Sequence, residues 1–337
     1  MLSFKSIAAF FSLVALVACQ PADQQDGKVE QGFYPGAIEV GHLVALDMAP
    51  LFVAVEKGYF DQEGLDVNTR FFANPGDNNA ALASGDLQLT VNPFTLPYLG
   101  AAAGGDFQFV ASAGGVGVME IVAQGELGVS SFEELIEYSR TNGSSVKIGS
   151  LRGDTLDVVV FKALEDRGSS YEDFEMVWFN DLLAMVQAFK AGEIDVLSHI
   201  KPYTTDLIVN FDAVSLGTNS SIWGVGTPNC VTMVMGDFAD QYPKTVEAYL
   251  KAIRRGYQDI IDDPVEAAKL LSEGNYYQVD EQVLIAAMRS LPDEVYLRPN
   301  MNGVNTAIED LVEQGYMEPV ERPVYDPSFL DAIDQEL

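Results

Sequence analysis

The sequence has 337 residues, 48% of them hydrophobic, and its 50 Asp and Glu residues outnumber its 19 Lys and Arg residues, which gives a formal net charge of −31. A surface this acidic repels phosphate groups over most of its area, so nucleic acid is excluded as a partner. A chain of this length and apolar content can bury two cores, and we therefore expect two domains.

The N-terminus has the pattern of an export signal that ends in a lipidation site. Lys5 precedes a short apolar stretch at 7–18, and Cys19 follows directly. This stretch is shorter than the roughly 20 apolar residues that a spanning helix needs. We predict a signal peptide at 1–18, lipidation at Cys19 and a lipid-anchored linker at 19–33, which place the protein in the periplasm or on the cell surface. A plain secretory signal is the alternative, because cleavage after a small residue requires no cysteine.

Helix and strand signals alternate from residue 38 to about 235, which is typical of an α/β fold with mainly parallel sheets. Strands are predicted at 38–46, 65–72, 87–91 and 107–112. Helices are predicted from Pro50 to a stop at Gly58, at 77–83 and at 94–103. The glycine-rich segment 113–117 then predicts a crossing into a second lobe.

A second set of alternating elements follows this crossing. Strands are predicted at 118–123, 146–150, 175–179, 194–198 and 213–216, with helices near 131–139, 154–166 and 181–191. The apolar run 230–235 is interpreted as the return to the first lobe, and helices are predicted at 246–261, 265–271, 281–290 and 305–313. The predicted lobes are therefore 34–115 plus 228–337, and 116–227.

One internal similarity supports two related lobes. Segment 81–92 (ALASGDLQLTVN) aligns without a gap with segment 188–199 (AFKAGEIDVLSH), which makes Asn92 and His199 equivalent. Both residues are predicted at the carboxyl end of a parallel strand, where open α/β sheets bind ligands. The alternative is chance, since helix-Gly-strand junctions recur in α/β folds.

Polar residues at four predicted helix starts are candidates for a binding cleft. Helix N-termini carry unpaired N–H groups that favour an anion or a carbonyl. We expect Asp77 to cap one helix, and Asn92 to cap another that begins at Pro93. Local capping without ligand contact is the alternative for each. The candidates from these starts are Asn78, Asn92, Phe94, Thr95, Arg152, Asp154, Thr155 and Asn180.

Charged and aromatic residues beside the predicted cleft extend this set. Arg152 and Lys201 are cations that suit a carboxylate, sulfonate or phosphate, with surface solvation as the alternative. Asp47 favours a ligand that bears an amine or amidine. Aromatic faces line pockets for planar ligands, although core packing is the alternative for each ring. The remaining candidates are Met48, His199, Tyr203, Trp223 and Asn229.

Neither a metal site nor a disulfide is expected. Asp47, His42, His199 and Cys230 show no ligand spacing of the His-x3-His kind. Cys230 is the one cysteine left once Cys19 carries lipid, which excludes an intramolecular bridge.

Three segments carry the next inference: APLFVAVEKGYFDQEGLD at 49–66, ALASGDLQ at 81–88 and YPKTVEAYLKA at 242–252. They resemble the periplasmic solute-binding proteins of ABC importers of the nitrate, sulfonate, taurine and thiamine-pyrimidine type, and the resemblance extends from about residue 38 to 315. It implies a two-lobed type II periplasmic-binding-protein fold, α/β with mainly parallel sheets, two hinge crossings and a helical C-terminal tail.

The resemblance also implies a function. We expect a monomer that captures a small polar organic ligand, namely a sulfonate, a carboxylate or a pyrimidine-like molecule, and delivers it to an ABC permease in the inner membrane. No cofactor and no catalysis are expected, and the lipid is the only expected membrane contact. Enzymes of the yeast pyrimidine-synthase type share the fold, but their family carries a cysteine-rich motif that is missing here. A ligand-sensing lipoprotein is the other alternative.

Overall fold

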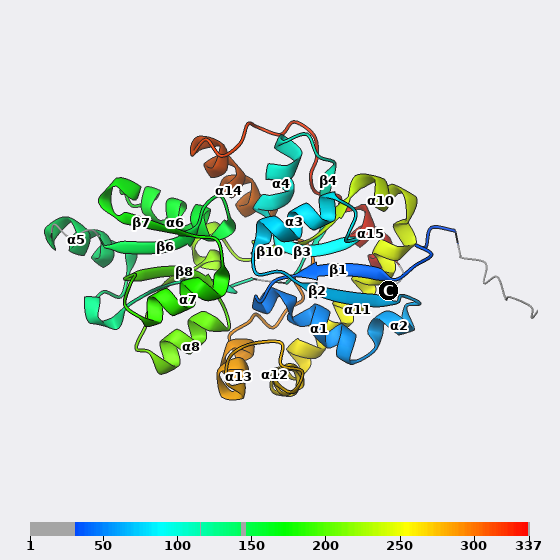
Figure 1. Cartoon of the computed structure of the whole chain (residues 1–337), viewed down its shortest axis with the longest axis horizontal. Helices are drawn as coiled ribbons and strands as arrows, with labels where there is room; N and C mark the ends of the chain where they lie inside the picture. Colours follow the sequence, from blue (N-terminus) through cyan, green and yellow to red (C-terminus); the bar gives the residue numbers. More distant parts are fainter. Residues whose placement is uncertain (1–30, 115, 143–145, 336–337) are drawn as a thin grey trace, which may run out of the picture.

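A computed structural model describes residues 31–114, 116–142 and 146–335, which form two α/β lobes side by side (Figure 1). The predicted signal peptide, the lipidation site Cys19 and nearly all of the linker lie outside the described residues. Within the described part, no helix combines the length and the apolar character that a membrane crossing requires.

The first lobe is built on a five-stranded sheet in the order β2-β1-β3-β10-β4. β1, β2 and β3 are parallel, and β10 is antiparallel to both β3 and β4. The strands are β1 (Ile38–His42), β2 (Val67–Phe71), β3 (Leu89–Pro93), β4 (Phe107–Ser112) and β10 (Cys230–Met235). The intervening helices are η1 (Leu46–Met48), α1 (Ala49–Glu56), α2 (Tyr59–Gln62), α3 (Pro75–Ala83) and α4 (Thr95–Ala102).

The second lobe repeats this arrangement in the order β7-β6-β8-β5-β9, with β5 antiparallel to both of its neighbours. Its strands are β5 (Met119–Ala123), β6 (Lys147–Leu151), β7 (Glu175–Phe179), β8 (Val196–Ile200) and β9 (Val214–Thr218). Its helices include α5 (Phe132–Asn142), α6 (Thr155–Glu165), α7 (Leu182–Lys190), α8 (Tyr203–Asn210) and α9 (Asn219–Trp223). The predicted two-lobed α/β fold is confirmed, with one antiparallel strand inside each sheet.

The internal similarity is also confirmed, down to single hydrogen bonds. Gly85 and Gly192 both adopt positive φ, at 81° and 70°, in the turn before the strand, a conformation that favours glycine. Asn92 Nδ2 donates to Pro75 O at 3.0 Å, and His199 Nε2 lies 2.8 Å from Leu182 O. Each accepting carbonyl belongs to the first residue of the preceding helix, so the same hydrogen bond joins helix and strand at the equivalent place in both lobes.

The C-terminal part is helical and contacts both lobes. α10 (Gly236–Gln241), α11 (Pro243–Asp262) and α12 (Pro264–Glu273) cover the first lobe, and α13 (Glu281–Arg289) packs between α12 and α8. α11 buries apolar residues at helical spacing, among them Val246, Leu250, Ile253 and Tyr257, against α1.

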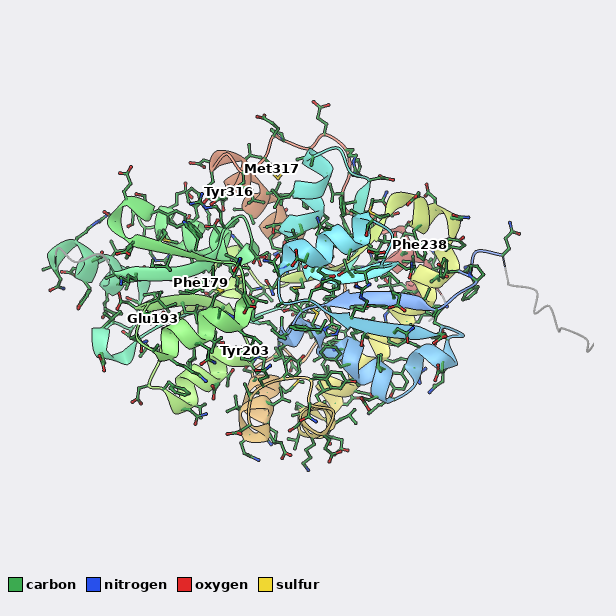
Figure 2. The ribbon with its side chains drawn as sticks, in the orientation of Figure 1. Phe179, Glu193, Tyr203, Phe238, Tyr316 and Met317 are labelled. Atoms are coloured by element: carbon green, nitrogen blue, oxygen red, sulfur yellow. The ribbon has the colours of Figure 1, made fainter. Side chains whose placement is uncertain are left out.

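The helix α14 (Met301–Glu313) lies on the second lobe, against α6 and α9, before α15 (Ser328–Asp334) returns to α11 and β4 (Figure 1). Figure 2 shows Tyr316, just after α14, beside the second lobe, where its side chain is hydrogen-bonded to Asp157. Gly303 packs so closely that an added Cβ would lie 2.0 Å from Thr227 Oγ1 and 2.6 Å from Trp223 O. The lobe boundaries given above stay a prediction.

Several predicted boundaries were wrong. The first strand ends at His42 instead of residue 46, because the chain turns into the 3-10 helix η1. The strands predicted at 87–91 and 194–198 are each displaced by two residues. The apolar runs did not distinguish the end of a buried strand from the equally buried loop that follows it. The helices α2, α8, α9, α10 and α15 were not predicted.

Candidate functional site

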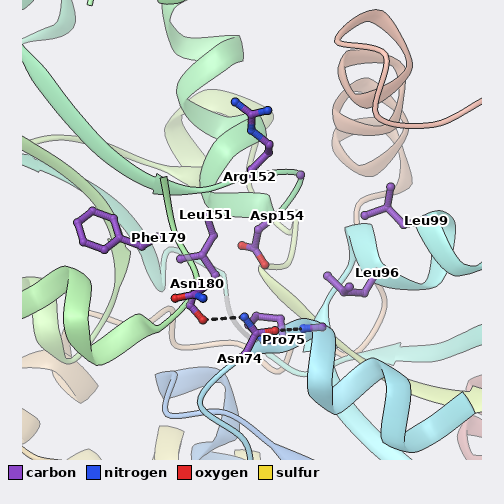
Figure 3. A pocket seen from close by; sticks show the side chains of 11 residues that line it. Asn74, Pro75, Leu96, Leu99, Leu151, Arg152, Asp154, Phe179 and Asn180 are labelled. Atoms are coloured by element: carbon purple, nitrogen blue, oxygen red, sulfur yellow. Dashed lines mark hydrogen bonds between the residues drawn. The ribbon is translucent and has the colours of Figure 1, made fainter. Parts of the chain in front are cut away.

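Two neighbouring cavities lie where the carboxyl ends of the strands of both lobes meet. The mouth cavity has a volume of about 240 Å³ and opens at the edge of the interface (Figure 3). It is lined by Asn74, Pro75, Gly76, Leu96, Leu99, Leu151, Arg152, Gly153, Asp154, Phe179 and Asn180. The inner cavity, of about 10 Å³, is lined by Leu43, Ala45, Pro75, Pro93, Asp154, Leu156, Leu182, Ile200, Asn229 and Cys230. Pro75 and Asp154 line both cavities, so the two lie side by side in the interface.

Asp154 is the polar centre of this site. It caps α6, and its Oδ1 accepts from Leu156 N at 3.0 Å and lies 3.1 Å from Thr155 Oγ1. Its Oδ2 is buried without a hydrogen-bond partner, and the residue is 5% exposed. Figure 3 shows the carboxylate pointing from the start of α6 toward Pro75 in the other lobe. Burial raises the pKa of Asp154 to about 6, and the free oxygen can accept a hydrogen bond from a ligand.

A second buried carboxylate, Asp47, has both oxygens engaged. Cys230 N donates to Oδ1 at 3.0 Å, and Asn229 Nδ2 donates to Oδ2 at 2.9 Å. Asn229 Oδ1 in turn accepts from Thr155 Oγ1 at 2.6 Å. This chain of hydrogen bonds joins η1, the second predicted crossing at 224–230 and α6, so it links the two lobes. Burial raises the pKa of Asp47 to about 6, yet its hydrogen bonds leave it no free acceptor comparable to Asp154 Oδ2.

The two predicted cations lie apart from the inner cavity. Lys201 is 8% exposed, and its Nζ donates to Ser290 Oγ at 2.8 Å, while its carbonyl accepts from Leu46 N at 2.9 Å. Burial lowers the pKa of Lys201. Arg152 is at the mouth, with its guanidinium 4.8 Å from the centre of the Trp178 ring. No basic side chain lines the inner cavity among the residues that the structure describes.

Two helix starts differ from the prediction. The cap of α3 is Asn74 instead of Asp77, since Asn74 Oδ1 accepts from Gly76 N at 2.7 Å and from Asp77 N at 3.2 Å. The signal that could have found it is the Asn-Pro pair, because proline is favoured at the first helical position after a capping residue. Asn74 Nδ2 also donates to Asn180 O at 2.6 Å, a direct bond between the lobes.

Asn92 and Pro93 belong to β3 and do not begin a helix. α4 begins at Thr95 after Phe94, without a side-chain cap. The prediction followed the favourable Asn-Pro pair, but in this place both residues pair with β10, so sheet formation prevailed over the capping preference.

Aromatic candidates form pairs inside the molecule. Phe94 and Trp223 meet edge to face at 5.6 Å, and Trp223 Nε1 is buried without a partner. Tyr203 packs edge-on against His199 at 5.7 Å. Burial lowers the pKa of His199 to about 4, so this ring is neutral and, at 2.8 Å from Leu182 O, carries its proton on Nε2.

The structure thus brings part of the predicted site together. Asp154 and Asn229 line the inner cavity, Arg152 and Asn180 join Asp154 at the mouth, and Asp47 and Thr155 are hydrogen-bonded to Asn229. The candidates that line neither cavity are Asp47, Met48, Asn78, Asn92, Phe94, Thr95, Thr155, His199, Lys201, Tyr203 and Trp223. Their contact with a ligand stays a prediction.

Sequence reasoning missed the apolar walls. Leu43, Leu156, Leu182 and Ile200 line the inner cavity, but their type and spacing are those of ordinary core residues. Within the described ranges no group of three or more His, Cys, Asp or Glu side chains could hold a metal ion.

The fold and the buried cleft between its lobes define a two-lobed periplasmic-type binding fold. The chain belongs to the NMT1-like family, whose model matches residues 34–272. It is 34% identical over 98 residues to the formylaminopyrimidine-binding protein of Halalkalibacterium halodurans, an alignment that covers 27% of each chain. The matched part is thus about a quarter of that relative's length.

Solved structures share the fold at low sequence identity. The alkanesulfonate-binding protein SsuA from Xanthomonas axonopodis pv. citri, bound to MOPS, superposes with a TM-score of 0.73 at 15% identity, over 87% of this chain and 98% of that one. The periplasmic nitrate-binding protein NrtA from Synechocystis PCC 6803 gives a TM-score of 0.76 at 16% identity, over 89% of each chain. These similarities establish the architecture.

Proposed function

We propose that this protein is the substrate-binding lipoprotein of an ABC importer, anchored through Cys19, which captures a small polar organic ligand between its lobes and delivers it to a permease in the inner membrane. It acts as a monomer in the periplasm or at the cell surface. Family membership and the binding proteins among its relatives support this role. Closure around the ligand would follow from a higher affinity of the ligand for the closed state.

The observation that carries the proposal is the buried, unpaired Oδ2 of Asp154 between the lobes. A buried polar atom without a partner is costly, so a site that contains one is suited to a ligand that supplies the missing donor. Among the described residues no basic side chain lines the inner cavity, and Arg152 in the mouth cavity is stacked on Trp178. These observations favour a ligand with N–H groups over a sulfonate or a carboxylate. A pyrimidine-like amine, the class named for the relative from Halalkalibacterium halodurans, has this chemistry.

Binding rather than catalysis is supported by the state of Cys230. Burial raises the pKa of its thiol well above the ordinary value, and the neighbouring carboxylates of Asp47 and Asp154 raise it further. Reactive cysteines require the opposite environment, in which the thiolate is stabilised.

The test is native mass spectrometry of the protein purified without denaturation, followed by calorimetric titration with 4-aminopyrimidine, an alkanesulfonate, a carboxylate and nitrate. We expect the aminopyrimidine to bind and Asp154→Ala to abolish that binding. Tight binding of the sulfonate or of nitrate, unaffected by this substitution, would contradict the proposed ligand class.

A further inference from the structure

We propose that the mouth cavity is a second compartment of the ligand site and that it holds an apolar arm of the ligand, attached to the N–H-bearing head that Asp154 binds. This inference rests on the proposed function and adds to it a two-part ligand, with a polar head and an alkyl or aryl extension.

The walls of the mouth cavity support an apolar occupant. Four of its large side chains are Leu96 and Leu99 from α4, and Leu151 and Phe179 from the ends of β6 and β7. They come from both lobes and line the same space of about 240 Å³. Figure 3 shows Leu96 and Leu99 on one side of it and Leu151 on the other, whereas the Phe179 ring points away. Apolar surface on two opposing walls gains free energy when a nonpolar group displaces water from between them.

Asp154 connects this space to the head position. It lines both cavities together with Pro75, and its Oδ2 is buried without a hydrogen-bond partner. A head that donates to Oδ2 therefore lies at the inner end of the mouth cavity, and a substituent on it that points away from the inner cavity enters the space between the leucines.

The rim shows how the arm is enclosed. Asn74 Nδ2 bonds to Asn180 O across the lobes at 2.6 Å, which fixes one edge of the closed mouth. Arg152 lies at the rim, and its guanidinium stacks on the Trp178 ring. This cation therefore already has a contact partner within the protein. Polar residues thus form the rim, while affinity for the arm comes from the leucine side chains.

The experiment measures calorimetric dissociation constants for 4-aminopyrimidine and its 5-methyl, 5-propyl and 5-hexyl derivatives. A buried methylene contributes about 0.8 kcal/mol, which corresponds to about fourfold in affinity. We expect the wild-type protein to gain about that factor per methylene from methyl to propyl. Leu99→Asn, at a half-buried position, should remove this gain per methylene, so that the series becomes flat.

Leu270→Asn is the control, because Leu270 is also half-buried but lies on α12, away from both cavities; it should preserve the full series. A flat series in the wild-type protein, or an equal loss for all four compounds in Leu99→Asn, would overturn the arm compartment while leaving the head site intact. If none of the four compounds binds the wild-type protein, the head assignment fails, and with it both the proposed ligand class and this inference.

Discussion

Replacing Asp154 by Asn is expected to stabilise the fold at neutral pH while it weakens ligand binding. Asparagine caps a helix as well as aspartate does, so the acceptor for Leu156 N is retained. The substitution removes a buried negative charge, which lowers the free energy of unfolding of the wild-type protein at neutral pH. It also replaces the free Oδ2 acceptor by a donor amide, which cannot receive an N–H group from the ligand.

The size of the effect follows from the pKa of Asp154. Burial raises it from 3.8 to about 6, so the folded state holds this proton more tightly than the unfolded chain does. Stability is therefore lost as the pH rises from about 4 to about 6, and the loss is complete above the folded pKa. The difference corresponds to about 3 kcal/mol, which is an upper bound for the gain in Asp154→Asn at pH 7.5. We expect a gain of about 1–3 kcal/mol.

The assay is urea unfolding of both proteins at pH 4, 5, 6 and 7.5. Asp47, whose pKa is also raised to about 6, titrates in both proteins, so the difference between their free energies of unfolding isolates Asp154. This difference should grow from near zero at pH 4 to a plateau above pH 6.5, while Glu137→Gln, at an exposed position, should show no such trend. A difference that is independent of pH, or a variant less stable than wild type at pH 7.5, would refute the reasoning.

Three further predictions test the structure around the site. Gly303→Ala should lower the free energy of unfolding by about 1–3 kcal/mol, because the added methyl group would overlap Thr227 and Trp223. The control Asn305→Ala, at an exposed position on the same helix, should be neutral or slightly stabilising. Equal changes in the free energy of unfolding for the two variants would contradict the close packing at Gly303. Lys201→Ala removes the part-buried hydrogen bond that joins the end of β8 to the end of α13. Titrations should therefore show charged and neutral ligands weakened by the same factor, about five- to tenfold; a loss confined to anionic ligands would instead indicate direct contact. Cys19→Ala should release the protein from membranes into the soluble fraction of the cells, and continued membrane association would count against lipidation.

The two α/β lobes and most of their strands could be anticipated because their signals are local, whereas the order of the strands in each sheet was not predicted. The strands that contain Asn92 and His199 are buried runs, each preceded by a glycine that the turn requires. Capping is local as well, and Asp154 was found because it directly precedes an apolar helix. The same rules failed at Asn92, where pairing with β10 from a distant part of the chain prevails.

The remainder of the site depends on contacts between distant residues. Nothing near Lys201 in the sequence indicates that its partner is Ser290, 89 residues further on. Similarly, the periodicity of α14 shows which face is buried but not which lobe covers it. The leucines of the mouth cavity resemble core residues until both lobes are assembled, because only the assembled interface leaves space beside them.

The position of α14 has a consequence for the order in which the chain can fold. A chain that ends at residue 230 contains all five strands of the second sheet, yet it lacks Val304, Ala307 and Leu311, which are buried in the complete protein. Until these residues arrive, α6 and α9 expose the apolar surface that α14 covers. The second lobe is thus encoded in the middle of the chain but is completed by its last tenth, so a nascent chain cannot finish the lobes one after the other.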